Sequence, residues 1–260
     1  MCHSPALLGP VWRSRLLLAF GLSTLISVVA ARQAHALVEG PDVPRVVSFG
    51  GVCVRCDLDT RNLTGARFMG GYFQQASLVG SRLKGASFTA SNFSGADFSH
   101  ADLSGATLIA ANFRGADFSG ALMTGLQSTA SSFNDADLEG ARLNNGSFQG
   151  TDFRGVNAEG AHFDGSRLLG AVLTDGDFEN ASFRGAELFG AVMTGAHFTH
   201  ADFKGARMRG AVITGADLSQ AINLTREQLS EACGDRATRL PPGVSAGLCN
   251  GHVIVFRRGP

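Results

Sequence analysis

Four of the five cysteines form two local pairs, and cysteines in such pairs either join in disulfides or bind zinc. Cys53 lies close to Cys56 in the chain, and Cys233 lies near Cys249. A four-cysteine zinc site would require the two pairs to meet, and the repeat described below places them at opposite ends. We therefore expect Cys233–Cys249 and Cys53–Cys56 disulfides, which are typical of an oxidising compartment. Buried thiols remain an alternative for Cys53 and Cys56.

No arrangement of side chains typical of catalysis is found in the sequence. It has no phosphate-binding glycine loop outside its repeat, no histidine pair at metal-binding spacing and no nucleophile elbow. His100 and His200 lie at positions where a turn explains them, and His162 and His197 lie at outward positions. We therefore expect no enzyme activity, no catalytic residues, no cofactor and no metal site.

A five-residue repeat covers most of the sequence and therefore determines where these cysteines and histidines lie. From Leu58 to Leu218 one register covers 33 repeats, and the central residue is Phe 15 times, Leu 12 times, Met three times and Ile once. The residue two before the centre is Ala in 21 repeats. The residue two after the centre is Gly in 21 repeats and Asn, Asp or His in six. The repeat thus explains an unusual composition that is rich in Gly and Phe. Of 260 residues, 34 are Gly and 19 are Phe, whereas one is Tyr.

A period of five fits neither regular element. Successive centres on an α-helix would lie about 140° apart and form no stripe, and an odd period on a strand would alternate between faces. A short extended side followed by a turn instead points the small residue and the centre inward, with Gly at the corner for a positive φ. The repeat therefore predicts a solenoid. Leu126 precedes the undersized centre Ser128, and Val156 precedes Ala158, which roughly conserves core volume.

The pattern A-(D/N)-(L/F)-x-G, as in residues 95–99 (GADFS), resembles the pentapeptide repeat family over about 165 of some 224 mature residues. The resemblance implies an all-β fold, a right-handed quadrilateral β-helix with four pentapeptides in each 20-residue coil. The 33 repeats then make about eight coils. Three similar segments that recur at the step of one coil support this coil length, namely 168–174 (LLGAVLT), 188–194 (LFGAVMT) and 208–214 (MRGAVIT).

The N-terminal segment has the pattern of an export signal. Arg13 and Arg15 precede an apolar run over residues 16–31, and Ala34 and Ala36 precede a cleavage site that would leave Leu37 as the new N-terminus. The run is shorter than the roughly 20 residues that a membrane-spanning helix needs. We expect an exported protein, periplasmic or secreted, without a stable membrane span after cleavage. A membrane anchor and a misassigned start upstream of a cytoplasmic protein are the alternatives.

Four segments follow from these patterns. Residues 1–36 are expected to be a cleaved signal peptide, 37–56 an N-terminal cap, 57–222 the β-helix and 223–260 a C-terminal cap. Thr225 followed by Gln228 is a capping-box signature that predicts a short helix over residues 226–232. Residues 252–256 resemble a strand, and a Cys233–Cys249 bridge would contribute roughly 3 kcal/mol.

The outward positions of one face are strongly acidic. This acidic face flanks the centres 58, 78, 98 and so on to 218, and it holds ten of the 17 acidic residues of the repeat region but no Lys or Arg. Such a row of like charges is relieved by a cation, a basic partner or solvent. Aspartate before the centre is also part of the family pattern and therefore has a structural explanation. The candidate binding residues are Asp97, Asp117, Asp137, Glu139, Glu159, Asp177 and Glu179.

The opposite face is basic and partly apolar. It carries Arg67, Arg167, Arg207 and Arg209 against a single acid, Glu187. Exposed apolar clusters often mark contact sites. The candidate apolar strip on this side and round the next corner consists of Leu169, Phe189, Val172, Val192 and Val212. Lateral packing of the solenoid, including homodimer contact, explains such a strip equally well.

Charge and export together favour a binding protein. Lys plus Arg equals Asp plus Glu at 22 each, which argues against a polybasic surface for nucleic acid. We expect a non-enzymatic rigid scaffold or protein–protein interaction module outside the cytoplasm, with an extracytoplasmic protein of unknown identity as partner and no nucleic acid. The alternative that the family resemblance implies is a DNA mimic that inhibits or protects topoisomerase in the cytoplasm.

Overall fold

Each five-residue repeat forms a short extended side and a tight turn. The structure is a computed structural model that describes residues 48–249. In most turns the carbonyl oxygen of the central residue accepts a hydrogen bond from the backbone N–H three residues later, as in Ala96 N to Phe93 O at 3.0 Å. The residue between them at the corner has a positive φ, 64° at Gly95 and 57° at His100. The predicted role of the glycine position is thus confirmed.

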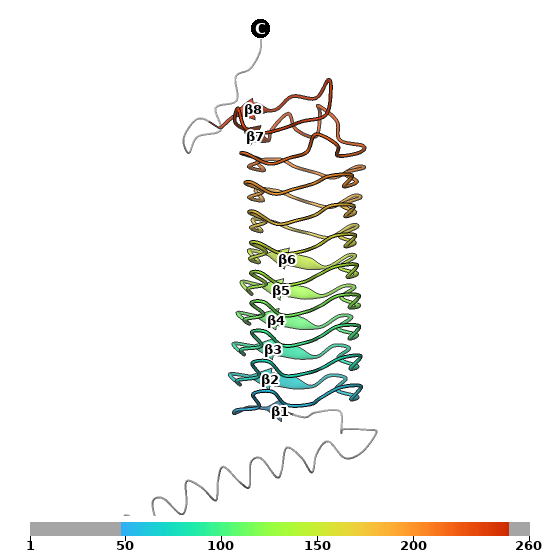
Figure 1. Cartoon of the computed structure of the whole chain (residues 1–260), viewed down its shortest axis with the longest axis vertical. Coiled ribbons are helices and arrows are strands. Elements are labelled where there is room, and N and C mark those ends of the chain that lie inside the picture. Colours follow the sequence, from blue (N-terminus) through green and yellow to red (C-terminus); the bar gives the residue numbers. More distant parts are fainter. Residues whose placement is uncertain (1–47, 250–260) are drawn as a thin grey trace, which may run out of the picture. The chain divides into compact units, whose positions relative to one another are not determined.

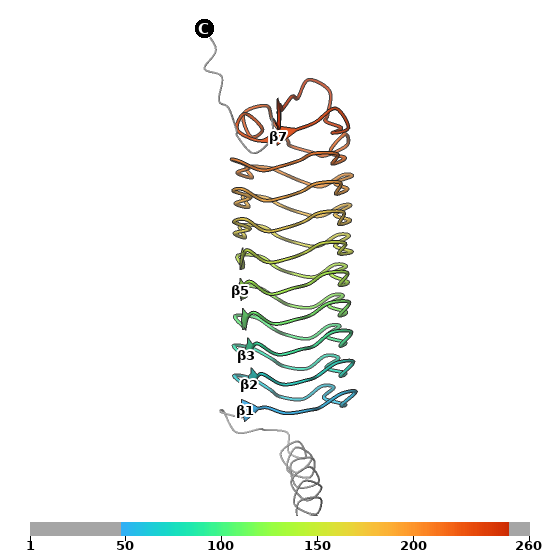
Figure 2. The same ribbon diagram turned by 90° about the vertical axis from the view of Figure 1, so that its left-hand side faces the viewer.

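Backbone pairing between successive coils builds four parallel ladders. Asp57 pairs with Ser77, Ser77 pairs with Asp97, and the same step repeats along this ladder to Asp217. The other ladders run through residues 52, 62 and 67 with the same step. The paired coils rise one above the other in both side views (Figures 1 and 2). The chain therefore folds as an all-β parallel solenoid with four sides and four repeats to each coil, as predicted.

The β-strands, each of two or three residues, lie on one side of the solenoid and in the C-terminal cap. Strands β1 to β6 form one parallel sheet in chain order, and β7 pairs with β8 in the cap. Their bounds are β1 Ser48–Phe49, β2 Arg67–Met69, β3 Ser87–Thr89, β4 Thr107–Ile109, β5 Gln127–Thr129, β6 Ser147–Gln149, β7 Cys233–Gly234 and β8 Gly247–Leu248.

The structure describes parts of the segments that were expected from the sequence. The expected signal peptide (1–36), residues 37–47 of the N-terminal cap and the strand-like run 252–256 lie outside the described residues. Coil pairing already begins at Ser48, within the segment expected to be the cap. Within residues 48–249, no helix has the length and hydrophobicity needed to cross a membrane.

The interior consists of the central and small residues of the repeats. All centres from Leu58 to Leu218 are buried. Phenylalanines at the same position of adjacent coils stack, with ring centroids 4.8 Å apart for Phe68 and Phe88 and 5.0 Å apart for Phe163 and Phe183. At the undersized centre, Leu126 is buried as predicted. The Ser128 hydroxyl lies 2.8 Å from Thr151 Oγ1, so this buried polar group is satisfied.

Three alanines occupy one corner of successive coils. Ala90, Ala110 and Ala130 have φ values of 50°, 50° and 51°, in the left-handed region that glycine adopts at most other corners. Alanine in this conformation is strained by roughly 1–2 kcal/mol. The sequence pattern did not predict these strained corners, because alanine carries no sign of a positive φ.

Replacing Ala90, Ala110 and Ala130 together with glycine is expected to stabilise the protein. Relief of strain exceeds the entropic cost of glycine, so each site should gain about 0.5 kcal/mol in the free energy of unfolding. Urea denaturation measures the sum. Ala96→Gly is the control, because this alanine is buried and has no positive φ, and it should destabilise. A triple glycine variant less stable than the parent would contradict the strain.

The C-terminal cap continues two ladders, and its described residues, 223–249, contain no helix. Val212 pairs with Cys233, and Asp217 pairs with Arg239. These two steps are one and two residues longer than the 20-residue step between the other coils. The helix predicted over residues 226–232 is wrong, since this segment forms turns. The capping-box contacts do form, with Thr225 N donating to Gln228 Oε1 at 2.8 Å. A helix does not form here because the segment is short and the chain must pair again with the ladder at Cys233.

Gln228 ties this turn to the last coil. Its Nε2 donates to the backbone carbonyl oxygens of Phe203 at 2.7 Å and Ala206 at 2.9 Å. Carbonyl groups at the open end of a solenoid have no coil above them and need such partners. The side chain therefore closes the end of the column in place of another coil.

Candidate functional site: the outward faces

The acidic face is a continuous ladder of side chains. Asp97 pairs with Asp117 and Asp117 with Asp137 in the parallel ladder of this face. Adjacent coils are about 4.8 Å apart, so neighbouring carboxylates repel by roughly 1 kcal/mol even in water. The structure thus places the predicted acidic residues on one side of the column, with the aspartates before the centres and the glutamates after them.

The aspartates of this row also stabilise the turns. In Asp97, Asp117, Asp137 and Asp177 one carboxylate oxygen accepts the backbone N–H two residues later, at 2.8 to 3.0 Å. Asn112 makes the same bond at 3.0 Å on another face. An uncharged amide therefore serves the turn as well. The turn therefore explains why these positions carry a short side chain with an oxygen acceptor, but not why they carry a negative charge.

Three glutamates of the same face have no structural use of this kind. Glu139, Glu159 and Glu179 follow the centres of successive coils. Glu139 and Glu159 are exposed and Glu179 is half-buried. Over residues 48–249 the structure records no hydrogen bond or ion pair to any of the three carboxylates. They are the part of the acidic face that is available to a partner.

A basic residue from the cap reaches the end of the acidic face. Arg239 Nη1 lies 3.2 Å from Asp217 Oδ2, and Asp217 also accepts bonds from Ser219. The Ser219 bonds lower the pKa of Asp217, against a smaller opposing effect of burial, and Arg239 lowers it further. The sequence did not reveal this contact because Arg239 lies beyond the end of the repeat, where the register no longer places side chains.

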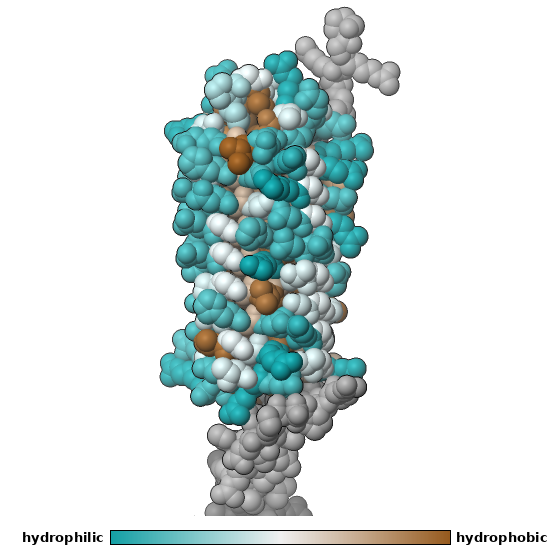
Figure 3. Space-filling view, turned by 90° about the vertical axis from the view of Figure 1, so that its right-hand side faces the viewer, coloured by the Kyte–Doolittle hydropathy of each residue, from teal (hydrophilic) through white to brown (hydrophobic). Residues whose placement is uncertain are grey.

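The apolar strip is less exposed than its residue types indicate. The side chain of Leu169 is 47% exposed, whereas Phe189, Val172, Val192 and Val212 are half-buried. One view of the molecule shows a mainly hydrophilic surface with separate apolar spots (Figure 3).

Arg207 covers part of the apolar strip. Its guanidinium carbon lies 4.6 Å from the centroid of the Phe189 ring, and its Nη1 lies 3.0 Å from Glu187 Oε1. The cation over the ring shields Phe189 from solvent. We retain the strip as a candidate contact surface without a specific partner.

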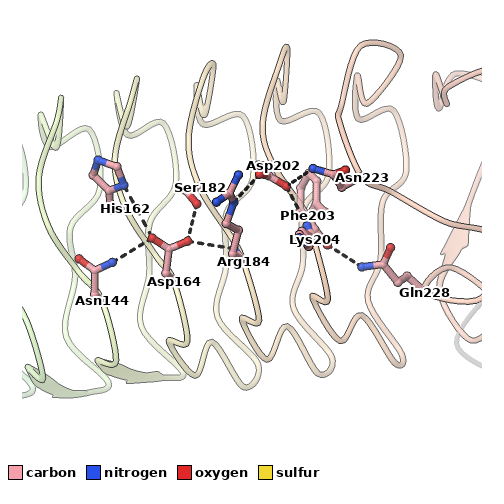
Figure 4. A network of polar contacts seen from close by, with 10 residues as sticks. All are labelled: Asn144, His162, Asp164, Ser182, Arg184, Asp202, Phe203, Lys204, Asn223 and Gln228. Atoms are coloured by element: carbon pink, nitrogen blue, oxygen red, sulfur yellow. Dashed lines mark hydrogen bonds and ion pairs between the residues drawn. The ribbon is translucent and has the colours of Figure 1, made fainter.

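A third face carries a network of polar side chains that leads to the cap (Figure 4). Asn144 Nδ2 donates to Asp164 Oδ2 at 3.0 Å, and Ser182 Oγ donates to Asp164. Arg184 then joins Asp164, through its backbone N–H at 3.2 Å, to Asp202, through its Nε at 2.5 Å. The network links successive coils.

Asp202 is the buried acid of this network. It is 6% exposed and accepts hydrogen bonds from Asn223 Nδ2 at 2.8 Å and from the Lys204 backbone N–H at 2.9 Å. Burial alone would raise the pKa of Asp202, but the bonds from Asn223, Lys204 and Arg184 outweigh it and hold the pKa below the usual value. Asp202 was not among the predicted site residues, because it lies outside the acidic face and residue spacing does not reveal that Arg184 and Asn223 enclose it.

Replacing Asp202 with asparagine is expected to lower the free energy of unfolding by about 2 kcal/mol at pH 7, because charge-assisted bonds are lost. The folded pKa lies below the unfolded value of about 3.9. The contribution is therefore full above that pH and disappears as the pH falls through the lowered pKa. Urea unfolding of the variant and parent at pH 7 and near pH 2 measures this loss.

The control for this prediction is Asp175→Asn, which alters an exposed aspartate and should change stability little at either pH. A stability difference between Asp202→Asn and the parent that stays constant from pH 7 to about pH 2 would contradict the assigned role.

The cysteines form the two expected disulfides. Cys53 joins Cys56 with a Cα separation of 5.4 Å, and Cys233 joins Cys249 with a Cα separation of 4.9 Å. His100 and His200 occupy corners with φ of 57°, as expected. Within the described range, no three His, Cys, Asp or Glu side chains are grouped as a metal site requires.

Comparison with known families confirms the repeat. The family model described as pentapeptide repeats matches residues 53–125 in overlapping copies and residues 131–222 in a second set. The chain belongs to the pentapeptide repeat family. The gap between the sets, residues 126–130, is the repeat with the serine centre. No curated protein sequence matches the chain.

Several solved structures of pentapeptide repeat proteins resemble the chain. HetL, involved in heterocyst differentiation regulation in the cyanobacterium Nostoc sp. strain PCC 7120, has 24% identity and a TM-score of 0.41, with 74% of this chain and 86% of that chain covered. A trypsin-treated variant of QnrB1, a plasmid-mediated fluoroquinolone resistance protein, has 19% identity, 72% and 92% coverage and a TM-score of 0.46.

A pentapeptide repeat protein from the Arabidopsis thaliana thylakoid lumen has 26% identity, 56% and 72% coverage and a TM-score of 0.22. Because all three TM-scores lie below 0.5, we draw no functional conclusion from these structures.

Proposed function

We propose that this pentapeptide repeat scaffold is a non-enzymatic interaction module that acts outside the cytoplasm and binds a basic protein surface along its acidic face. The observation that carries the proposal is the row of Glu139, Glu159 and Glu179, whose charges serve no turn and meet no cation in the described part of the chain. The two disulfides and the signal-like N-terminal sequence support an oxidising compartment.

A protein partner suits the row better than a single ion. A calcium ion requires six to eight oxygens that converge on one point, whereas these carboxylates follow each other from coil to coil. An extended surface with Lys or Arg at similar intervals would meet all three charges at once. Electrostatic complementarity of this kind mainly accelerates association and selects partners.

Quantitative crosslinking in the extracytoplasmic fraction tests the proposal. The variant carries Glu139→Gln, Glu159→Gln and Glu179→Gln, and a matched control carries Asp152→Asn, Glu187→Gln and Glu227→Gln, the same charge change on two other faces and in the cap. We expect the first variant to lose a basic partner by about tenfold, while the control keeps it. Equal capture by all three proteins would refute the role of the acidic face.

The acidic face would also suit the alternative, a DNA mimic acting on topoisomerase. The repeat region has 12 basic and 17 acidic residues, a modest net charge of −5. The signal-like segment and the disulfides favour export instead. Inhibition or protection of gyrase supercoiling by micromolar protein would support the alternative over our proposal.

A further inference from the structure

The Cys53–Cys56 disulfide spans one ordinary turn of the solenoid. Cys53 occupies a centre position of the repeat and Cys56 the next small position. Cys56 N donates to Cys53 O at 3.4 Å, the bond that Ala66 N makes to Leu63 O at 3.0 Å. The corner residue, Arg55, has a φ of 58°, close to the 54° of Thr60. The two cysteines therefore share the backbone geometry of repeats that contain no cysteine.

This turn does not need its covalent bond. Later repeats form it with a Leu or Phe centre and an Ala, held by backbone hydrogen bonds alone. The coil around the disulfide also pairs in the usual way, with Cys53 N donating to Tyr72 O at 2.7 Å and Ser77 N to Cys56 O at 2.8 Å. None of these bonds involves a sulfur atom, so we expect the disulfide to open and close within a folded coil.

The disulfide also lies where another molecule can reach it. Both Cys53 and Cys56 are half-buried, whereas all centres from Leu58 to Leu218 are buried. Val52, Val54 and Tyr72 beside them are 77%, 46% and 53% exposed. Thiol–disulfide exchange requires direct attack on a sulfur atom, so access governs its rate.

The second disulfide joins segments 16 residues apart instead of the two ends of one turn. Cys233 is buried and continues a coil ladder, whereas Cys249 is half-buried and lies in a segment outside the repeat. The β8 segment pairs with the two residues of β7, and Cys249 N donates to Gly234 O at 2.9 Å, so opening the disulfide leaves β8 held by this short pairing. This bond is structural and serves as the internal comparison.

We propose that Cys53–Cys56 is a redox-active site that exchanges two electrons with a dithiol protein. A thiolate of the partner attacks one of the two sulfurs, which forms a mixed disulfide and releases the other cysteine as a thiolate. The second thiol of the partner, once deprotonated, then attacks the mixed disulfide. The partner leaves oxidised, and this chain keeps Cys53 and Cys56 as a dithiol after proton uptake. The role goes beyond the proposed scaffold function and does not depend on it.

The test treats the full mature protein with thioredoxin and its reducing system, followed by alkylation and mass spectrometry of each cysteine. We expect Cys53 and Cys56 to be labelled at least about tenfold faster than Cys233 and Cys249, with the circular dichroism spectrum unchanged. Thioredoxin lacking its second active-site cysteine should remain joined to this chain. Equal rates for both disulfides, or reduction that occurs only in denaturant, would overturn the proposal.

Two further comparisons test whether Cys53–Cys56 is needed for stability and whether any thiol reduces it as fast as a dithiol protein does. Cys53→Leu with Cys56→Ala installs residues found at the same positions of other repeats, and its melting temperature should fall less than that of Cys233→Ala with Cys249→Ala. A larger fall would make Cys53–Cys56 the structural bond. Reduced glutathione at equal thiol concentration should be at least about tenfold slower than thioredoxin, and an equal rate would contradict a dithiol protein as the partner.

Discussion

Phe93→Ala is expected to lower the free energy of unfolding by about 4 kcal/mol, the largest loss we predict for one substitution. Phe93 is buried, and removing its ring leaves a cavity between the preceding and the following coil. Five other rings lie with their centroids 4.7 to 5.6 Å from that of Phe93, namely Phe68, Phe73, Phe88, Phe98 and Phe113. Urea denaturation followed by circular dichroism measures the loss.

Phe93→Leu is the matched control, because leucine is the second most frequent centre of the repeat. It should cost about 1 kcal/mol, since the site accepts a smaller apolar side chain with some repacking. The solenoid couples each coil mainly to its neighbours, so hydrogen exchange in the alanine variant should increase first near residue 93. A loss below about 1 kcal/mol for Phe93→Ala would contradict the stacked core.

Cys233→Ala with Cys249→Ala is expected to lower the free energy of unfolding by about 3 kcal/mol. The bond joins cysteines at a sequence separation of 16, and the open chain gains conformational freedom when unfolded. The cap covers the end of the last coil, so its loosening also exposes the carbonyl groups that Gln228 caps. Differential scanning calorimetry measures the shift in melting temperature.

Hydrogen exchange locates the effect of this double substitution. Residues 225–249 should lose protection before the coils between residues 57 and 200 do, because the bond joins segments of the cap alone. An unchanged melting temperature, or loss of protection that starts at the opposite end of the column, would show that the cap does not depend on the disulfide.

The repeat made most of the fold predictable. A large centre, a small residue two before it and glycine two after it fix which side chains point inward and where the chain turns, because each role is filled by a distinct residue type. The coil length followed from segments such as 188–194 and 208–214, and the ladder from residue 57 to residue 217 confirms it. Both disulfides formed between the cysteines that were paired by sequence distance.

Features outside the repeat were not predictable in the same way. The Thr225 to Gln228 signature suggested a helix, but Gln228 also bonds the last coil, and the chain rejoins a ladder at Cys233. A local signature carries no information about these tertiary contacts.

The faces were only partly predictable. Position in the repeat told which acids lie in a row, but not that a turn uses each aspartate while the side chains of the three glutamates bond no residue between 48 and 249. It also placed Asp202 outward, whereas Arg184 and Asn223 enclose it. Likewise, Phe189 was expected to be exposed, and Arg207 covers it. Contacts between long side chains of different coils depend on rotamers, which the spacing of residues does not specify.

The central claim is that this scaffold works outside the cytoplasm, and the intact mass of the mature protein in fractionated cells tests it most directly. We predict a chain that begins at Leu37, lies in the periplasmic or secreted fraction and lacks four thiol hydrogens because both disulfides are formed. A chain that retains residues 1–36 and is found reduced in the cytoplasmic fraction would contradict the account.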